Sequence, residues 1–187
     1  MKEIIIYGRG GQGAVTAAQL LATAAFLEGY WAQTFPQFGA ERRGAPVIAY
    51  IRIDKEPIAI RSKVYAPDVV VVMDFNLFKM IKPLDNLKAG GTAIINFPAG
   101  DRQLPDQIKK KADHIYTIDA STIAHQIYGK TAIPITNIIH MGAYCAAMKD
   151  VSNESIITAL PDFFAENKLE INRKAAQMGY ENIKGVS

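Results

Sequence analysis

The sequence predicts an α/β fold with a largely parallel sheet, and three observations carry that prediction. Short apolar runs alternate along the chain with longer segments of helix-forming residues, as in β–α–β units. The run 69–73 is almost wholly valine, which is typical of a strand buried on both faces. The run 4–7 is closed by glycine, and the Ala- and Leu-rich segment 14–28 is followed by Gly29, where a helix C-terminus is capped. Helices should therefore flank the sheet.

Strands are expected at 4–7, 30–35, 47–53, 58–60, 69–73, 92–96 and 115–118. Helices are expected at 14–28, 75–88 with an interruption at Pro83, 121–128, 137–149, 153–160 and 166–178. The runs 47–53 and 58–60 flank a turn and predict a β-hairpin inserted into the parallel sheet. The last three helices follow one another without a strand and predict a C-terminal helical segment.

Length and composition indicate one soluble domain over residues 1–187. The chain is 49% hydrophobic, and its 14 Gly and 9 Pro are close to average usage, so a fibrous or low-complexity protein is excluded. Cys145 is the single cysteine, which excludes an intramolecular disulfide and an iron–sulfur cluster held by this chain. The single cysteine favours a reducing, cytoplasmic compartment. We expect no membrane segment, because no window approaches about 18 apolar residues.

The charge pattern disfavours a nucleic-acid partner. Lys and Arg number 21 against 18 Asp and Glu, a net charge of +3. Nucleic-acid binders concentrate basic residues on one face. The densest basic run here, 109–111, stands between Asp106 and Asp113 and predicts only a solvated helix end.

A glycine-rich turn joins the first predicted strand to the first predicted helix and has the sequence Gly8-Arg9-Gly10-Gly11-Gln12-Gly13. Its G-x-G-x-x-G spacing in a strand–turn–helix context indicates a Rossmann-like fold. Glycines permit positive φ and close backbone approach, and a helix N-terminus attracts an anion such as phosphate. Arg9 would add a positive charge and Thr16 a hydroxyl. A turn that merely allows tight packing is the alternative.

The second predicted strand argues against NAD or FAD as the ligand. A dinucleotide site places an Asp or Glu about 20 residues beyond the glycine turn, where it binds ribose. The strand here ends in the segment 34–38, which contains no carboxylate.

A second unusual segment, residues 35–46, should form a loop beside the glycine turn. Its candidate binding residues are Phe38, Gly39, Glu41, Arg42 and Arg43. Arginine forks bind phosphate or carboxylate through two hydrogen bonds, and Glu41 could hold one guanidinium in position. An ordinary surface salt bridge is the alternative.

The sequence predicts no catalytic residue. His114, His125 and His140 lack the neighbours of a catalytic triad. His140 lies in an apolar helix and should be packed, and Cys145 should be a small buried hydrophobe. The chain therefore has a candidate binding site without a catalyst.

Five segments together carry a family resemblance that spans nearly the whole chain, and they are 8–13, 16–18, 35–46, 67–71 and 136–143. The sequence resembles the gamma subunit of 2-oxoacid:ferredoxin oxidoreductases. Within it, the segment Glu41–Pro46 is more similar to pyruvate and branched-chain 2-oxoacid enzymes than to 2-oxoglutarate enzymes. The indolepyruvate and 2-oxoglutarate enzymes of the same class stay open. A free-standing nucleotide-binding protein and a scaffold without a ligand are further alternatives.

The resemblance implies a division of labour. In this family, thiamine diphosphate with magnesium and the iron–sulfur clusters belong to alpha, beta and delta-type partner subunits or domains. The 2-oxoacid is decarboxylated there, coenzyme A takes the acyl group, and electrons pass to ferredoxin. The gamma subunit is implicated in coenzyme A binding and assembly. The isolated chain is then expected to be inactive.

Overall fold

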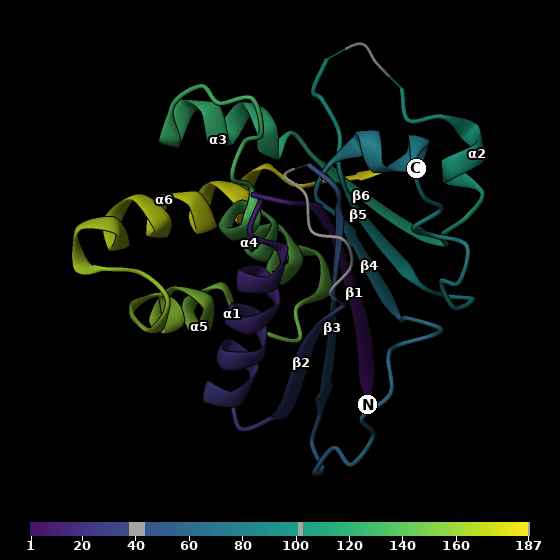
Figure 1. Ribbon diagram of the computed structural model, residues 1–187, viewed down its shortest axis with the longest axis horizontal. Helices are drawn as coiled ribbons and strands as arrows, with labels where there is room; N and C mark the ends of the chain where they lie inside the picture. Colours follow the sequence, from purple (N-terminus) through teal and green to yellow (C-terminus); the bar gives the residue numbers. More distant parts are fainter. Residues whose placement is uncertain (38–43, 101–102, 187) are drawn as a thin grey trace.

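A mixed sheet runs through the molecule in the computed structural model, which describes residues 1–37, 44–100 and 103–186 (Figure 1). Its seven strands follow the order β2-β3-β1-β4-β5-β6-β7. The strands are β1 (Lys2–Arg9), β2 (Trp31–Gln37), β3 (Pro46–Asp54), β4 (Val69–Val72), β5 (Thr92–Asn96), β6 (His114–Ile118) and β7 (Lys184–Val186). The helices are α1 (Ala14–Leu27), α2 (Asp106–Lys109), α3 (Ala120–Tyr128), α4 (Asn137–Met148), α5 (Asn153–Ala159) and α6 (Glu166–Asn182), with 3-10 helices η1 (Phe75–Lys79) and η2 (Leu160–Asp162).

The predicted α/β architecture is confirmed. The four strands β1, β4, β5 and β6 are parallel and form the centre of the sheet. On one side β3 and then β2 add antiparallel strands, and on the other side β7 pairs antiparallel with β6. The expected C-terminal helical segment is also present as α4, α5 and α6.

An antiparallel strand pair is inserted beside the parallel strands, but the predicted pairing of 47–53 with 58–60 was wrong. Residues 58–60 form no strand, and β3 pairs antiparallel with β2, which precedes it in the chain, and with β1. The reason is that both edges of β3 are occupied. It pairs with β1 from Pro46 to Ile53 and with β2 from Ile48 to Asp54, so no edge is left for a third strand.

The predicted helix 75–88 was also wrong. Only η1 forms there, and turns follow it. The Asp74 carboxylate accepts the backbone N–H of Asn76 and begins this short helix. Pro83 lacks an N–H and disfavours helical backbone at Lys82, so the helix does not extend. The short elements α2 and β7 were not predicted, because runs of four and three residues carry no usable periodicity.

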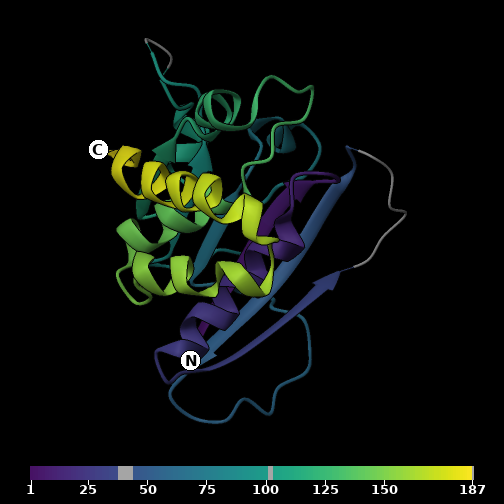
Figure 2. The same cartoon turned by 90° about the vertical axis from the view of Figure 1, so that its left-hand side faces the viewer.

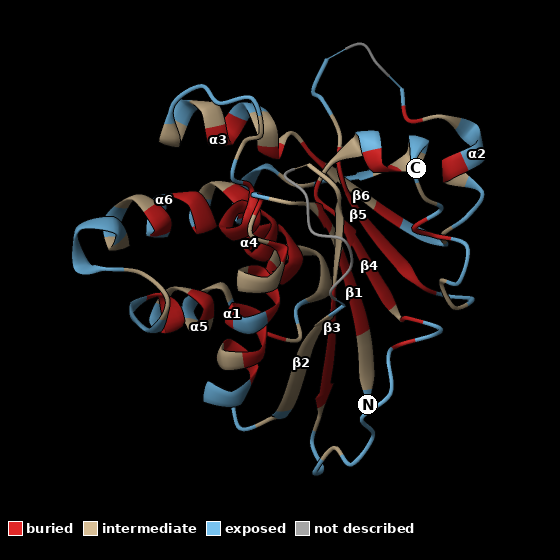
Figure 3. Ribbon diagram, in the orientation of Figure 1, coloured by how far each residue is buried: buried red, intermediate tan, exposed pale blue. Residues whose placement is uncertain are grey.

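The two faces of the sheet are covered unequally. Helices α1, α4, α5 and α6 lie on one face, whereas η1, α2 and loops cover the other (Figures 1 and 2). Because side chains alternate along a strand, Val69 and Val71 of β4 join the large core under the helices. Val70 and Val72 point the other way and join a smaller core with Leu77. The most fully buried segments are therefore the central strands and the inner helices (Figure 3).

Two glycines let helices α4 and α6 approach each other at backbone distance. A Cβ on Gly142 would stand 1.9 Å from the carbonyl oxygen of Ala176, and a Cβ on Gly179 would stand 1.9 Å from that of Ile139. This close crossing fixes α4, whose N-terminus belongs to the candidate site.

Candidate functional site

The glycine turn lies at the carboxyl end of β1 and leads directly into α1 (Figure 1). β1 is parallel to β4 on one side and antiparallel to β3 on the other. The strand order also reverses at β1, since β4, β5 and β6 follow on one side and β3 and β2 lie on the other. In open α/β sheets, ligands bind beyond the carboxyl ends of the parallel strands, next to such a reversal. The predicted turn therefore occupies the edge of the sheet where a ligand site is expected.

Hydrogen bonds within the turn use some of its backbone groups. Gly10 N–H donates to the carbonyl of Ala45 at 2.9 Å, and Gly44 N–H donates to the carbonyl of Gly10 at 3.2 Å. The Gln12 side-chain oxygen accepts the Arg9 N–H at 2.8 Å, and Gln12 N–H donates to the Arg9 carbonyl at 2.9 Å. The turn is thus tied to the segment that leads into β3.

The Arg9 side chain links the glycine turn to Asp74 and Gly44. Its Nη1 lies 3.3 Å from Oδ2 of Asp74, and its Nε donates to the carbonyl of Gly44 at 3.1 Å. The Arg9 side chain is 29% exposed and that of Asp74 13%, so the pair is partly shielded from water. The positive charge of Arg9 is therefore shared with Asp74, and a direct contribution of Arg9 to anion binding stays a prediction.

The N-terminus of α1 supplies the donors of the site. Its N-cap residue, Gly13, has φ 80° and no side chain to accept a backbone N–H. Helical geometry gives the first-turn amides of Ala14, Val15 and Thr16 no acceptor within the helix. Gly11 has φ 99°, and apart from its chain neighbours a Cβ there would meet no atom of the described residues within 4 Å. The described part of the chain therefore leaves the space beside Gly11 open to a ligand.

A second helix N-terminus meets this one. A Cβ on Gly13 would stand 2.5 Å from Nδ2 of Asn137, the first residue of α4. The Asn137 side-chain oxygen accepts the N–H of Ile138 at 2.9 Å, and the amide nitrogen is the part that lies against Gly13. The positive ends of two helix dipoles therefore converge, which favours an anion beside this contact.

The N-cap of α4 carries a buried hydroxyl without a partner. Thr136 is fully buried, its side chain makes no capping bond, and its Oγ1 has no hydrogen-bond partner among the described residues. His140 is fully buried, as predicted, and its Nδ1–H donates to the Thr136 carbonyl at 2.8 Å. Burial lowers the pKa of His140 to about 4, although that hydrogen bond acts in the opposite direction, so the ring is neutral at pH 7.

Part of the predicted site lies outside the described residues. These candidates are Phe38, Gly39, Glu41, Arg42 and Arg43. The description resumes at Gly44, which contacts Arg9. The structure brings together the glycine-turn candidates, and half-buried Thr16 stands on the first turn of α1.

The sequence did not assign a role at this site to Asp74 or Asn137. The sequence does show a local signal for each residue. Asp74 directly follows a valine-rich strand, and Asn137 is the first residue of an apolar helix. Only the fold shows that these signals meet the glycine turn, because the residues lie 62 and 124 positions beyond Gln12 and Gly13 respectively.

No metal centre is formed by the side chains that the structure places. Within the described ranges, no group of three or more His, Cys, Asp or Glu residues could hold a metal ion. Burial raises the pKa of the Cys145 thiol, and this one cysteine does not fit an iron–sulfur cluster. None of the described helices is both long and apolar enough to cross a membrane.

Comparison with known proteins identifies the family. Residues 3–182 match the family model described as pyruvate ferredoxin/flavodoxin oxidoreductase. The chain belongs to this family. A relative from Pyrococcus furiosus, the common subunit gamma of pyruvate/ketoisovalerate oxidoreductases, is 46% identical over 184 residues, covering 98% of each chain. A pyruvate synthase subunit from Methanocaldococcus jannaschii is 43% identical over 183 residues, covering 98% of this chain and 97% of that one.

A solved structure agrees with the family assignment. The crystal structure of a pyruvate oxidoreductase subunit from Thermotoga maritima has a TM-score of 0.79 and 32% identity, and the match covers 100% of this chain and 98% of the other. The gamma-subunit resemblance and the Rossmann-like α/β fold predicted from the sequence are therefore confirmed for this pyruvate ferredoxin/flavodoxin oxidoreductase chain.

Proposed function

We propose that this chain binds coenzyme A through its glycine turn within a pyruvate- or 2-oxoisovalerate-oxidising ferredoxin oxidoreductase. The single observation that carries the proposal is the meeting of two helix N-termini at Gly13 and Asn137. The names of the relatives, which specify pyruvate and ketoisovalerate enzymes, support the substrate class. These names favour a pyruvate or ketoisovalerate enzyme over an indolepyruvate enzyme, a 2-oxoglutarate enzyme and a free-standing nucleotide-binding protein.

Coenzyme A suits this site because it is a polyanion. The first-turn amides of α1 would donate to phosphate oxygens, and the amide nitrogen of Asn137 would donate from the opposite side. Gly11 leaves room for the phosphate, since a Cβ there meets no atom of the residues that the structure describes within 4 Å. Arg42 and Arg43 would add charged forks to the same ligand. The chain thereby orients coenzyme A and provides no reacting group.

The chemistry belongs to partner subunits in this proposal. Alpha, beta and delta-type subunits hold thiamine diphosphate, magnesium and the iron–sulfur clusters, and ferredoxin accepts the electrons. Thiamine diphosphate, when bound there, supplies the carbanion chemistry of decarboxylation. The one cysteine of this chain supports placing the clusters elsewhere. The complex acts in the cytoplasm without a nucleic acid or membrane partner.

Calorimetric titration of the assembled complex tests the site. Coenzyme A should bind at least about tenfold more tightly than pantetheine, which lacks its phosphate groups and adenosine. Gly11→Ala places a methyl group in the open space and should weaken binding of coenzyme A while leaving pantetheine unchanged. Gly90→Ala is the matched control, since Gly90 also has positive φ and an open Cβ position but precedes β5 at the other end of the sheet. Wild-type affinity of the Gly11 variant for coenzyme A would overturn the proposal.

A further inference from the structure

The sheet face opposite α1 is covered by crossovers whose helices are unusually short. The connection from β4 to β5 contains η1, five residues long, and that from β5 to β6 contains α2, four residues long. Parallel sheets normally have full helices on both faces. Among the described residues, the smaller core on this face has nine buried apolar residues and eight that are only partly buried, against 32 and 14 in the large core. Some apolar side chains of this smaller core therefore stay partly exposed on the outer side of the crossovers.

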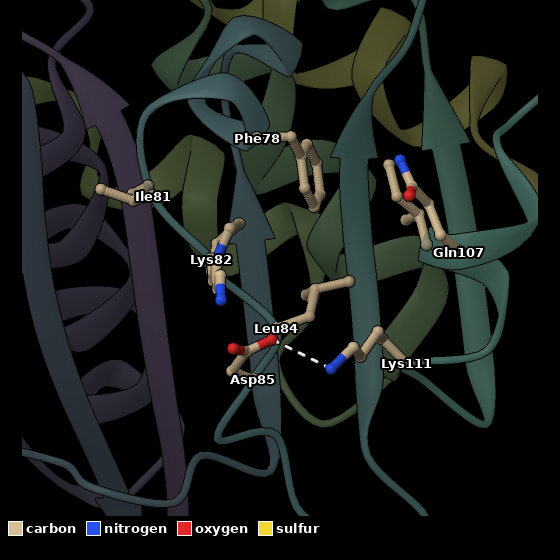
Figure 4. Close-up of a pocket in the computed structure, with 9 residues that line it drawn as sticks. Phe78, Ile81, Lys82, Leu84, Asp85, Gln107 and Lys111 are labelled. Carbon is tan, nitrogen blue, oxygen red and sulfur yellow. Dashed lines mark ion pairs between the residues drawn. The ribbon is translucent and has the colours of Figure 1, made fainter.

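An open pocket of about 340 Å³ lies between these two crossovers (Figure 4). This crossover pocket is lined by Phe78, Ile81, Lys82, Pro83, Leu84, Asp85, Gln107, Ile108 and Lys111. Leu84 and Ile108 are buried beneath it, whereas Phe78 and Ile81 are half-buried. Met80, which is 56% exposed, follows η1 on the same crossover. One apolar side chain from outside could enter here and remove water from these surfaces.

The rim of the crossover pocket carries a small excess of positive charge. Lys82 and Lys111 line it together with Asp85. Lys79 and Lys110 are exposed on the same two crossovers, as is Asp106. Asp85 forms an ion pair with Lys111 at 3.1 Å, drawn as the dashed line in Figure 4. Both members of that pair are well exposed, at 52% and 40%, so Lys111 can exchange Asp85 for another carboxylate. An apolar hollow with a basic rim complements an apolar side chain flanked by acidic residues.

We propose that the crossover pocket is the docking surface for an acidic segment of another subunit of the oxidoreductase. One apolar side chain of that segment enters between η1 and α2, and a neighbouring carboxylate pairs with Lys82. The inference rests on the proposed role of the chain as a subunit, and it adds which face is covered and by what chemistry. It concerns a surface separate from the glycine turn, because no residue of that turn lines the pocket and the turn leads into α1, on the opposite face of the sheet (Figure 1).

Reconstitution of the complex from a tagged form of this chain and the other subunits tests the surface. Lys82→Glu should weaken assembly at least about tenfold near 50 mM NaCl and much less near 500 mM, because salt screens the charge effect. Ile81→Ser should weaken assembly at both salt concentrations, because it removes apolar contact. Lys174→Glu on α6 is the matched control, since Lys174 is also exposed but lies on the helical side of the molecule.

A photo-crosslinking residue at position 80 identifies the occupant directly. The expected product joins this chain to an acidic peptide of a different subunit. Crosslinking to a second copy of this chain, or wild-type assembly of both the Lys82 and Ile81 variants, would overturn the proposal. The Lys82 and Ile81 variants should keep the coenzyme A affinity and the thermal stability of the wild type. The docking proposal and the coenzyme A proposal can therefore fail separately.

Discussion

The amide nitrogen of Asn137 lies where a side chain on Gly13 would have to be, 2.5 Å from the position of a Cβ. Two residues 124 positions apart thereby place the N-termini of α1 and α4 against each other. Such a contact brings like partial charges together, which costs free energy in the absence of an anion. The binding of an anion there compensates that cost, which is why we place the phosphate site at this point.

Gly13→Ala should destabilise the protein by about 2–4 kcal/mol, because both positive φ and the contact with Asn137 oppose a methyl group. Gly11→Ala should cost only about 1 kcal/mol, since it meets positive φ but open space. Urea unfolding of the two variants checks the difference. Equal free energies of unfolding would show that Asn137 does not constrain Gly13.

Gly142→Ala and Gly179→Ala should each cost about 3 kcal/mol or more. The new methyl would stand 1.9 Å from a backbone carbonyl of the facing helix, which cannot move aside without separating α4 from α6. Thermal unfolding monitored by circular dichroism measures the loss. Gly100→Ala, where a Cβ meets no described atom within 4 Å, is the comparison variant. Native-like stability of either helix variant would contradict the observed crossing.

His140 should make stability fall as pH decreases from about 6.5 to about 4. Its folded pKa is lowered to about 4 from 6.5, so within this window the unfolded chain binds a proton that the folded chain does not. The loss approaches about 3 kcal/mol at the acidic end. Carboxyl groups titrate in the same window, and His140→Asn isolates the contribution, because its unfolding free energy should vary less with pH. Identical pH profiles for both proteins would refute the assignment.

Arg42 and Arg43 should have different effects, a prediction that comes from the sequence alone. Neighbouring side chains in an extended loop point to opposite sides. One Arg→Ala variant should raise the Michaelis constant for coenzyme A at least about tenfold, and Arg→Lys there should rescue poorly. The other variant should affect assembly or do little. Wild-type kinetics and assembly in both alanine variants would favour an ordinary surface salt bridge.

Local signals predicted most of the fold correctly. The valine run of β4, the glycine after β1 and the Ala-rich α1 are each specified by their own residues. The failures have non-local causes. Residues 58–60 have strand-like composition, but β1 and β2 already occupy both edges of β3. Which strand takes an edge depends on the pairing of the whole sheet.

The candidate site also combines features that local sequence predicts with features that depend on the whole fold. The glycine turn could be predicted because its spacing is contained within six residues. The contribution of Asn137 could not, because the close crossing of α4 and α6 positions α4 from the far end of the chain. The pairing of Arg9 with Asp74 likewise depends on β4 lying beside β1.

The measurement that tests the central claim most directly is the Michaelis constant for coenzyme A in the assembled enzyme carrying Asn137→Asp. An acidic residue at the first position of α4 favours the helix itself, so folding should be preserved. The same negative charge opposes an anion at Gly13. We expect the constant to rise at least about tenfold, with turnover at saturating coenzyme A nearly unchanged. Asn167→Asp, at an exposed position on α6, is the control and should leave the constant unaltered. An unchanged Michaelis constant in the Asn137 variant would contradict an anion site beside the two helix N-termini.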